Sequence, residues 1–177
     1  MIGIDPGEFH RVRGHYATGV AIVTAADPAG GSVGVTVNSF TFTSVSLAPE
    51  LVLFSLARTL RSLPAFLDAK HYGINILTAK QRELSARFAT GVADKWSNIA
   101  VGTGEHGVPL IDEALASLEC KRHSIVEGGD HLVFICRIVD LGARSDNEPL
   151  LYFRGNYWRR PEIMPDAKSE RQFYPSR

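Results

Sequence analysis

Hydrophobic and polar positions along the chain follow patterns that predict a mainly β protein. Short apolar runs of strand length, rich in β-branched residues, occur at GVAIVTA (19–25), ELVLFSL (50–56) and YGINIL (72–77). Turn residues join 19–25 to GVTVNSF (34–40), which predicts a hairpin. ELVLFSL is apolar at almost every position, so we expect that strand to be buried on both faces.

The second half of the chain repeats the strand pattern. SLECKRHSIV (117–126) and HLVFICRIVDLGA (131–143) flank the turn EGGD and predict another hairpin. LLYFRGNYWRR (150–160) predicts a final strand, and the polar tail 160–177 follows it. The segment 90–112, rich in glycine, predicts a loop.

Two segments have helical spacing instead. SLPAFLDAKH (62–71) offers Ser62 as N-cap and Pro64 in the first turn. AKQRELSARFA (79–89) places Leu84 and Phe88 four residues apart on one face. About seven strands and two helices indicate a single domain over 1–177, a closed or partly closed antiparallel β-barrel with helical decoration.

Composition and charge narrow the function classes. The 177 residues are 45% hydrophobic and 21% charged, and 19 basic residues balance 19 acidic ones. Zero net charge disfavours duplex nucleic acid or an anionic membrane surface as a partner. The N-terminus has no apolar signal region, and apolar runs fall short of the ~18 residues of a membrane span. We therefore expect a soluble, cytoplasmic protein.

Cysteine and histidine usage predicts no metal site. Cys120 and Cys136 stand alone in strand-like surroundings, and the six histidines are scattered, so we expect two reduced core thiols. GTGEHG (102–107) matches G-x-G-x-x-G, but it lacks the preceding buried strand and following helix of a dinucleotide site. No GxSxG motif supports a serine hydrolase. His131 differs from the other histidines because the GDH turn (129–131) places it at a strand mouth.

The strand 34–40 carries an unusual number of polar groups. Alternation points Thr36, Asn38 and Phe40 to one side, and Val35, Val37 and Ser39 to the other. The hydroxyl cluster Thr43, Ser44 and Ser46 follows where the strand ends. Such donors can bind an anion without net positive charge, and a phosphate-bearing flat ring would use both features. A strand that hydrogen-bonds to itself explains these residues equally well.

The ordered set of motifs resembles the flavin reductase family. YATGVAIVTA, GVTVNSF, TSVSL-x-P-x-LVLFSL, YGINIL, LS-x-RFA, GVPLID-x-ALASLEC, GGDHLVF and PLLYFRGNY occur in that order over about residues 9 to 159. The resemblance implies a mainly β, FMN-binding split barrel with a few flanking helices. It also implies an NAD(P)H:flavin oxidoreductase, a homodimer with FMN (or FAD) near its interface, NADH (or NADPH) as co-substrate, and a flavin-dependent monooxygenase as partner.

The resemblance also carries site residues to this chain. It implies an isoalloxazine lining by Thr36, Val37, Asn38, Ser39 and Phe40, with Thr43 and Ser44 at the flavin and its phosphate-bearing chain. It places Ser55, Leu56, Arg58, Thr59 and Leu60 at a phosphate or ribityl contact, and Phe88, Ala89 and Lys95 on a closing helix and loop. It puts His131 beside the nicotinamide, and Tyr152, Phe153, Arg154 and Tyr157 on a strand bordering the same pocket.

One departure and two alternatives qualify this assignment. NSFTFTSVSLAPEL has two residues more than the family's usual NSF-x-SVSLDPPL, with Ala48 and Glu50 where Asp and Pro are usual. An insertion of two residues keeps each later side chain on the same face of the strand, so we expect a bulge or a longer loop. Hydride transfer needs the protein mainly to position two rings, which agrees with the lack of a strong acid or base. A pyridoxamine-phosphate-oxidase-like enzyme and a non-catalytic flavin- or haem-binding split barrel remain alternatives.

Overall fold

The computed structural model describes residues 3–42, 49–92, 94–143 and 147–159. Its elements are as follows, in chain order: α1 (Pro6–Arg13), β1 (Thr18–Gly19), β2 (Ala21–Ala26), β3 (Ser32–Val37), β4 (Thr41–Phe42), β5 (Leu51–Ala57), α2 (Leu63–Asp68), β6 (His71–Ile76), the 3₁₀ helix η1 (Ala79–Gln81), α3 (Arg82–Ala89), β7 (Val101–Thr103), β8 (Pro109–Ile111), β9 (Ala116–Gly128), β10 (His131–Ala143), β11 (Leu151–Phe153) and β12 (Asn156–Trp158).

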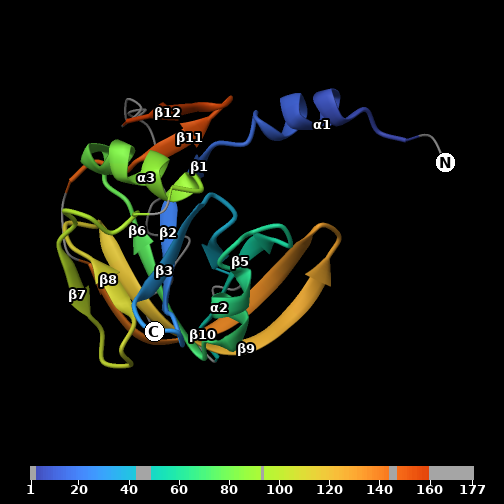
Figure 1. Ribbon diagram of the computed structural model, residues 1–177. Coiled ribbons are helices and arrows are strands. Elements are labelled where there is room, and N and C mark those ends of the chain that lie inside the picture. The colour runs from blue at the N-terminus through green and yellow to red at the C-terminus, as the bar shows by residue number, and fades with distance from the viewer. Residues whose placement is uncertain (1–2, 43–48, 93, 144–146, 160–177) are drawn as a thin grey trace, which may run out of the picture.

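One antiparallel sheet of seven strands forms the body, in the order β3-β2-β6-β9-β10-β5-β4. It curls until its two ends meet, so that Ser39, just beyond β3, hydrogen-bonds the backbone of Ser55 in β5. Figure 1 shows the long β9–β10 ribbon crossing below, α2 lying in the opening between β3 and that ribbon, and α3 lying at the opposite end of the sheet. The mainly β antiparallel barrel expected from the sequence is confirmed.

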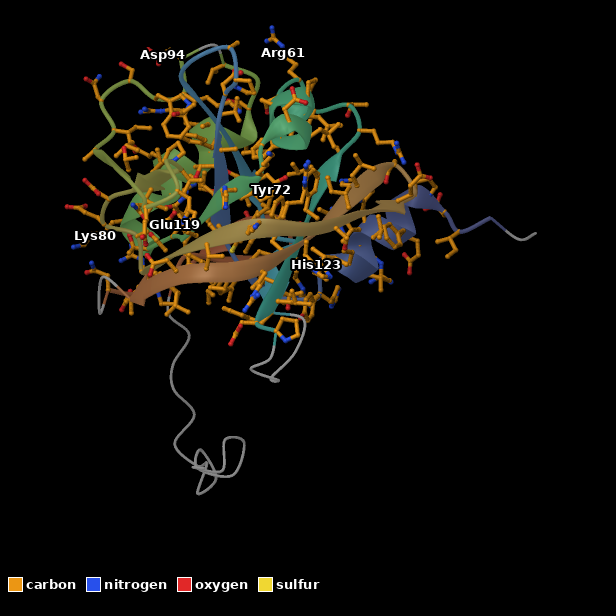
Figure 2. All side chains as sticks on the ribbon, turned by 90° about the horizontal axis from the view of Figure 1, so that it is seen from below. Arg61, Tyr72, Lys80, Asp94, Glu119 and His123 are labelled. Atoms are coloured by element: carbon orange, nitrogen blue, oxygen red, sulfur yellow. The ribbon has the colours of Figure 1, made fainter. Side chains whose placement is uncertain are left out.

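Aromatic side chains fill the barrel. Phe54 in β5 and Phe134 in β10 are cross-strand partners whose rings stack with centroids 5.0 Å apart. Tyr72 meets both rings edge-on and is fully buried, and it lies in the interior in Figure 2. Its hydroxyl lies 2.9 Å from the carbonyl of Phe66 in α2, which holds that helix on the barrel. Truncating one such buried ring to alanine would lower the free energy of unfolding by about 3–5 kcal/mol.

The burial of β5 differs from the expectation for ELVLFSL. Val52, Phe54 and Leu56 are buried, whereas Leu53 and Ser55 between them are only half-buried. The prediction of burial on both faces is therefore wrong for this chain. The strand lies in a curved antiparallel sheet. The barrel core covers one face of β5, and the other face is only partly covered.

A second, smaller core lies between the sheet and α3. Phe88 in α3 is fully buried there with Val20, Ile22 and Leu77. Gly34 in β3 permits the approach, because a Cβ at that position would lie 2.5 Å from Cε1 of Phe88. The helix thus packs on the outer face of β3, and the predicted helical segment 79–89 is confirmed with a 3₁₀ first turn.

Two segments contain hairpins that the sequence did not predict. The expected loop 90–112 holds β7 and β8, which pair antiparallel. The expected single strand 150–160 is divided into β11 and β12 by a turn at Arg154 (φ 50°) and Gly155 (φ 76°). Two successive positive φ values suit a two-residue hairpin turn, so the strand reverses where the sequence pattern predicted continuity.

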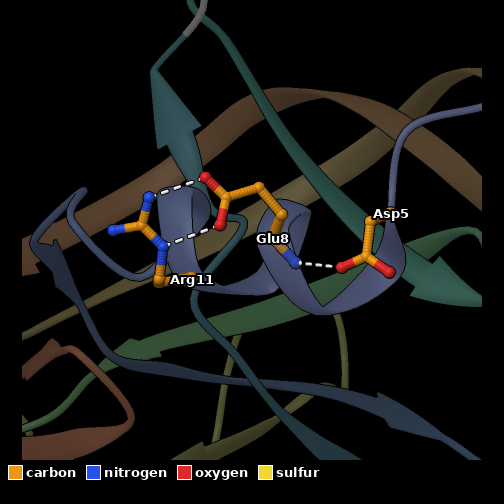
Figure 3. Close-up of polar contacts among 3 residues, drawn as sticks. All are labelled: Asp5, Glu8 and Arg11. Atoms are coloured by element: carbon orange, nitrogen blue, oxygen red, sulfur yellow. Dashed lines mark hydrogen bonds and ion pairs between the residues drawn. The ribbon is translucent and has the colours of Figure 1, made fainter.

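Helix α1 was also absent from the sequence-based expectation. Asp5 caps its start by accepting from the backbone N–H of Glu8 at 2.8 Å, and Glu8 pairs with Arg11 at 2.6 Å (Figure 3). All its residues are exposed, including Phe9 and Val12, and Figure 1 shows it standing away from the barrel. With little apolar contact to the rest of the described chain, α1 depends on local capping and charge pairs.

Candidate functional site

A cavity of about 980 Å³ lies between β3, β5, the start of α2, and α3 with the loop that follows it. This volume is at the upper end of the range for small-molecule and cofactor sites. Many residues assigned from the sequence line it, and their positions are as follows: Thr36, Val37, Asn38 and Ser39 after and within β3, Ser55 and Leu56 in β5, Thr59 and Leu60 before α2, Phe88, Ala89 and Lys95 at α3 and its loop, and His131 at the start of β10.

The polar residues of β3 divide between protein and cavity. Thr36 donates its hydroxyl to the carbonyl of Ser85 in α3 at 2.7 Å. Ser39 accepts from the N–H of Ser55 at 3.0 Å and lies 3.3 Å from its carbonyl oxygen. Asn38 lies between them, is exposed, and lines the cavity. Thr36 and Ser39 therefore hydrogen-bond to the protein itself, whereas Asn38 is available to bind a ligand.

The predicted alternation ends with β3 itself. Thr36 faces α3 while Val35 and Val37 face the barrel, as expected. The chain bends at Asn38, and Phe40 then packs against the barrel core. Placing Phe40 on the same side as Thr36 was therefore wrong, because alternation holds only while the strand stays extended.

Lys95 brings a cation to the cavity wall. Its ammonium group donates to the carbonyls of Phe88 at 3.1 Å and Gly34 at 3.4 Å. Burial lowers the pKa of Lys95, since the charged form is partly removed from water. An ammonium has three donors, and these bonds use two of them. An anion in the cavity would complete its hydrogen bonds and favour the charged form.

The cavity also has lining residues that sequence reasoning missed. Arg13 at the end of α1, Arg61 before α2 and Trp96 beside Phe88 all belong to it. Figure 2 shows Arg61 projecting at the same end of the molecule as Asp94. Arg61 could have been predicted, because it lies two residues beyond Thr59, which was assigned to the site. Arg13 could not, because it lies in α1, a helix without the periodic apolar face that would have predicted it.

His131 stands at the edge of the cavity where β10 begins. It pairs with Ala57 across β5–β10, and its side chain remains 43% exposed. Nδ1 lies 2.7 Å from Oδ1 of Asp130. The hydrogen bond to His131 lowers the pKa of the Asp130 carboxyl, so this carboxylate is charged at neutral pH. The pair leaves Nε2 as the ring nitrogen for a ligand.

Several assigned residues do not line this cavity. Arg58 turns away from it, and the β11–β12 residues lie elsewhere. Tyr157 hydrogen-bonds Ser85 at 3.0 Å and packs against Tyr152, so both support α3 from its other side. Arg154 donates its backbone N–H to Gly14 at 2.9 Å, and Phe153 packs on Trp158. The described residues that line the cavity do not include Tyr152, Phe153, Arg154 or Tyr157, which were predicted to border it. Thr43 and Ser44 lie outside the described residues.

The glycine-rich loop 102–107 serves a carboxylate of the protein. It forms the turn between β7 and β8, so the rejection of a dinucleotide-binding helix is confirmed. Glu119 is buried there and accepts from the backbone N–H groups of Glu105 at 2.7 Å and His106 at 2.9 Å. Burial raises the pKa of Glu119, but these hydrogen bonds and the side chain of His106, whose Nδ1 lies 3.2 Å away, outweigh it and the net pKa is lowered. Successive N–H groups of a turn make such an anion cradle.

The helices of the described part of the chain are all too short or too polar to cross a lipid bilayer.

Comparisons with known proteins agree on one family. A model described as a flavin reductase like domain matches residues 13–159. A flavin reductase of Pseudomonas putida is 40% identical over 87% of this chain and 89% of its own length. The reductase component of a 4-nitrophenol 4-monooxygenase/4-nitrocatechol 2-monooxygenase of Rhodococcus opacus is 41% identical, over 87% and 80%. The solved NADH:FAD oxidoreductase of Streptomyces globisporus, in complex with NAD and FAD fragments, superposes with a TM-score of 0.81 at 31% identity, covering 94% of this chain and 99% of that one.

Proposed function

This chain belongs to the flavin reductase like family, and from that membership we propose that it transfers hydride from NADH to a flavin and supplies reduced flavin to a monooxygenase. The observation that carries the proposal is the cavity between β3, β5 and α3, lined by residues that the sequence motifs had assigned to flavin. Its volume is sufficient for a flavin together with a nicotinamide ring.

The donor set of the cavity fits a flavin. Leu60 and Trp96 offer apolar and aromatic surface for a flat ring system, and Asn38 offers an amide to its polar edge. Lys95, with one donor remaining, and the hydroxyl of Thr59 suit a phosphate. When bound, the flavin supplies the hydride acceptor. One relative is named an FMN reductase (NADH) and another was solved with FAD fragments, and FMN or FAD would use the same donors here.

The contribution of the chain is positioning. His131 stands at the cavity edge, where we place the nicotinamide, and Asp130 fixes one nitrogen of its ring. Holding two rings in a reactive geometry lowers the barrier by up to ~7–11 kcal/mol, without an acid or base. In this proposal His131 orients the nucleotide, and the walls of the cavity hold the flavin ring.

We also propose a homodimer. Leu53 and Ile135 are cross-strand partners on the outer face of the sheet, with Val133 nearby, and all three are half-buried. Val126 on β9, the cross-strand partner of Val133, is 45% exposed. Together with Phe9 and Val12 of α1, this apolar surface is suited to a second copy. Light scattering at micromolar concentration should return about twice the chain mass of 19.4 kDa, and a monomer would refute the dimer.

The partner that fits is a flavin-dependent monooxygenase, as for the relative from Rhodococcus opacus. We place the reaction in the cytoplasm, where NADH is available and where two buried free thiols stay reduced. The oxygenase would receive flavin that has left the open cavity.

The test is NADH oxidation followed at 340 nm with FMN or FAD, and with NADPH for comparison. We expect flavin-dependent loss of absorbance. Flavin binding without NAD(P)H oxidation would favour the non-catalytic carrier, and oxidation of a pyridoxal-type substrate by oxygen would favour the oxidase-like alternative. His131→Ala should raise KM for NADH with flavin affinity nearly unchanged, since a lost ground-state contact appears mainly in KM. A variant that loses flavin would move His131 to the flavin site.

A further inference from the structure

Arg58 was assigned to a flavin phosphate from its position between two cavity residues, but it contacts another part of the protein. Its Nε donates to the carbonyl of Gly129 at 3.1 Å, and its NH2 group lies 3.0 Å from Oε1 of Glu127. Its backbone N–H donates to the carbonyl of Asp130 at 2.9 Å. Arg58, just beyond β5, therefore contacts Glu127, Gly129 and Asp130 around the β9–β10 turn, the first two through its side chain and the third through its backbone.

That turn delivers His131 to the cavity. Gly129 has φ 70°, and the chain enters β10 at His131 immediately afterwards. Asp130 is the only turn residue between them, and it holds Nδ1 of the histidine at 2.7 Å. A displacement of the turn relative to β5 would therefore move the histidine ring and its carboxylate partner together, at the rim where Ala57 and Thr59 lie.

The contacts of Arg58 suit positioning better than global stabilisation. Its side chain is 42% exposed and that of Glu127 is 84% exposed, and exposed ion pairs contribute little to stability. The planar guanidinium presents its donors to the carbonyl and the carboxylate in a rigid fork, whereas the donors of an ammonium rotate on a flexible stem. The arrangement fixes where the turn lies without being needed for the barrel core.

We propose that Arg58 is a positioning residue for His131: it ties the β9–β10 turn to the end of β5 and so sets the place of the histidine at the cavity edge. The consequence for NADH rests on the proposed function. The consequence for the histidine ring does not, because it concerns the unliganded protein.

The first experiment measures the ring itself. Side-chain ¹⁵N NMR of the unliganded protein, with His131 assigned by the signal missing from His131→Ala, reports which ring nitrogen carries the proton. We expect Arg58→Ala and Arg58→Lys to shift the His131 resonances toward mixed tautomers. Arg11→Ala, which removes another exposed arginine–glutamate pair, should leave them unchanged. Unchanged His131 resonances in a folded Arg58→Ala protein would overturn the proposal, whatever the enzyme activity.

The second experiment is a double-mutant cycle on NADH kinetics. Arg58→Ala should raise KM for NADH about 5- to 30-fold with flavin affinity nearly unchanged. The effect should vanish in the His131→Ala background, because residues that act through one another are not additive. Equal effects in both backgrounds would overturn the proposal. Loss of flavin affinity in Arg58→Ala would instead return Arg58 to the flavin phosphate.

Discussion

Removing the hydroxyl of Ser39 should destabilise the barrel at the place where its two ends meet. β4 pairs with β5 at Thr41↔Leu53, and two residues further on the ladder is continued by the side chain of Ser39 on Ser55. Ser39→Ala leaves the backbone N–H and carbonyl of Ser55 without these partners in a half-buried position.

The magnitude follows from the groups left behind. An unsatisfied buried donor or acceptor costs about 1–3 kcal/mol, and partial access to water places Ser55 at the lower end. We therefore expect a loss of about 1–2 kcal/mol in the free energy of unfolding. Asn38→Ala is the matched variant, because Asn38 is the neighbour of Ser39 in the chain but has an exposed side chain that lines the cavity. It should leave unfolding within about 0.5 kcal/mol and weaken flavin binding by about 1–2 kcal/mol.

Urea unfolding measured by circular dichroism, and flavin titration followed by fluorescence, separate the two effects. Ser39→Ala should lower the urea midpoint with an unchanged slope, while Asn38→Ala should lower only flavin affinity. The reasoning is refuted if Ser39→Ala unfolds like the wild type, or if Asn38→Ala destabilises the protein and binds flavin normally.

Three further predictions concern the packing around the site. Gly34→Ala forces a Cβ to within 2.5 Å of the Phe88 ring and should cost about 1–3 kcal/mol in unfolding free energy, whereas Gly19→Ala, with open space around its Cβ, should cost less than about 0.5. Glu119→Gln should cost about 1.5–3 kcal/mol near pH 7, by urea unfolding. Because the folded pKa of Glu119 is lowered, its stabilisation is complete above the ordinary value of 4.5, and the difference from the variant should shrink as pH falls below that; a constant difference would contradict the cradle. Burial raises the pKa of the Cys136 thiol to about 12 and raises that of Cys120 too, so a thiol reagent should modify both only after unfolding, and fast reaction of the native protein would contradict their placement.

The local pattern of the sequence determined the types of most elements and much of the cavity. Short apolar runs rich in β-branched residues identified β2, β5 and β6, turn residues between strand-like segments identified the β2–β3 and β9–β10 hairpins, and the spacing of Leu84 and Phe88 identified α3. Asn38, Lys95 and His131 were assigned from motifs and do line the cavity. Such assignments succeed because hydrogen-bonding within an element and the burial of one face depend on neighbours in the chain.

The partners of polar side chains across the sheet were decided by the tertiary structure alone. Ser39 bonds Ser55 because the sheet curls until its ends meet, and Arg58 reaches Gly129 because β5 lies beside β10. The glycine-rich loop around residue 104 encloses Glu119 of another strand, although its letters match a nucleotide motif. Each of these contacts joins groups far apart in sequence, and period and spacing carry no information about which distant backbone will stand within 3 Å. The sequence therefore indicated which residues could face a ligand, and the closure of the barrel determined which of them remained available for one.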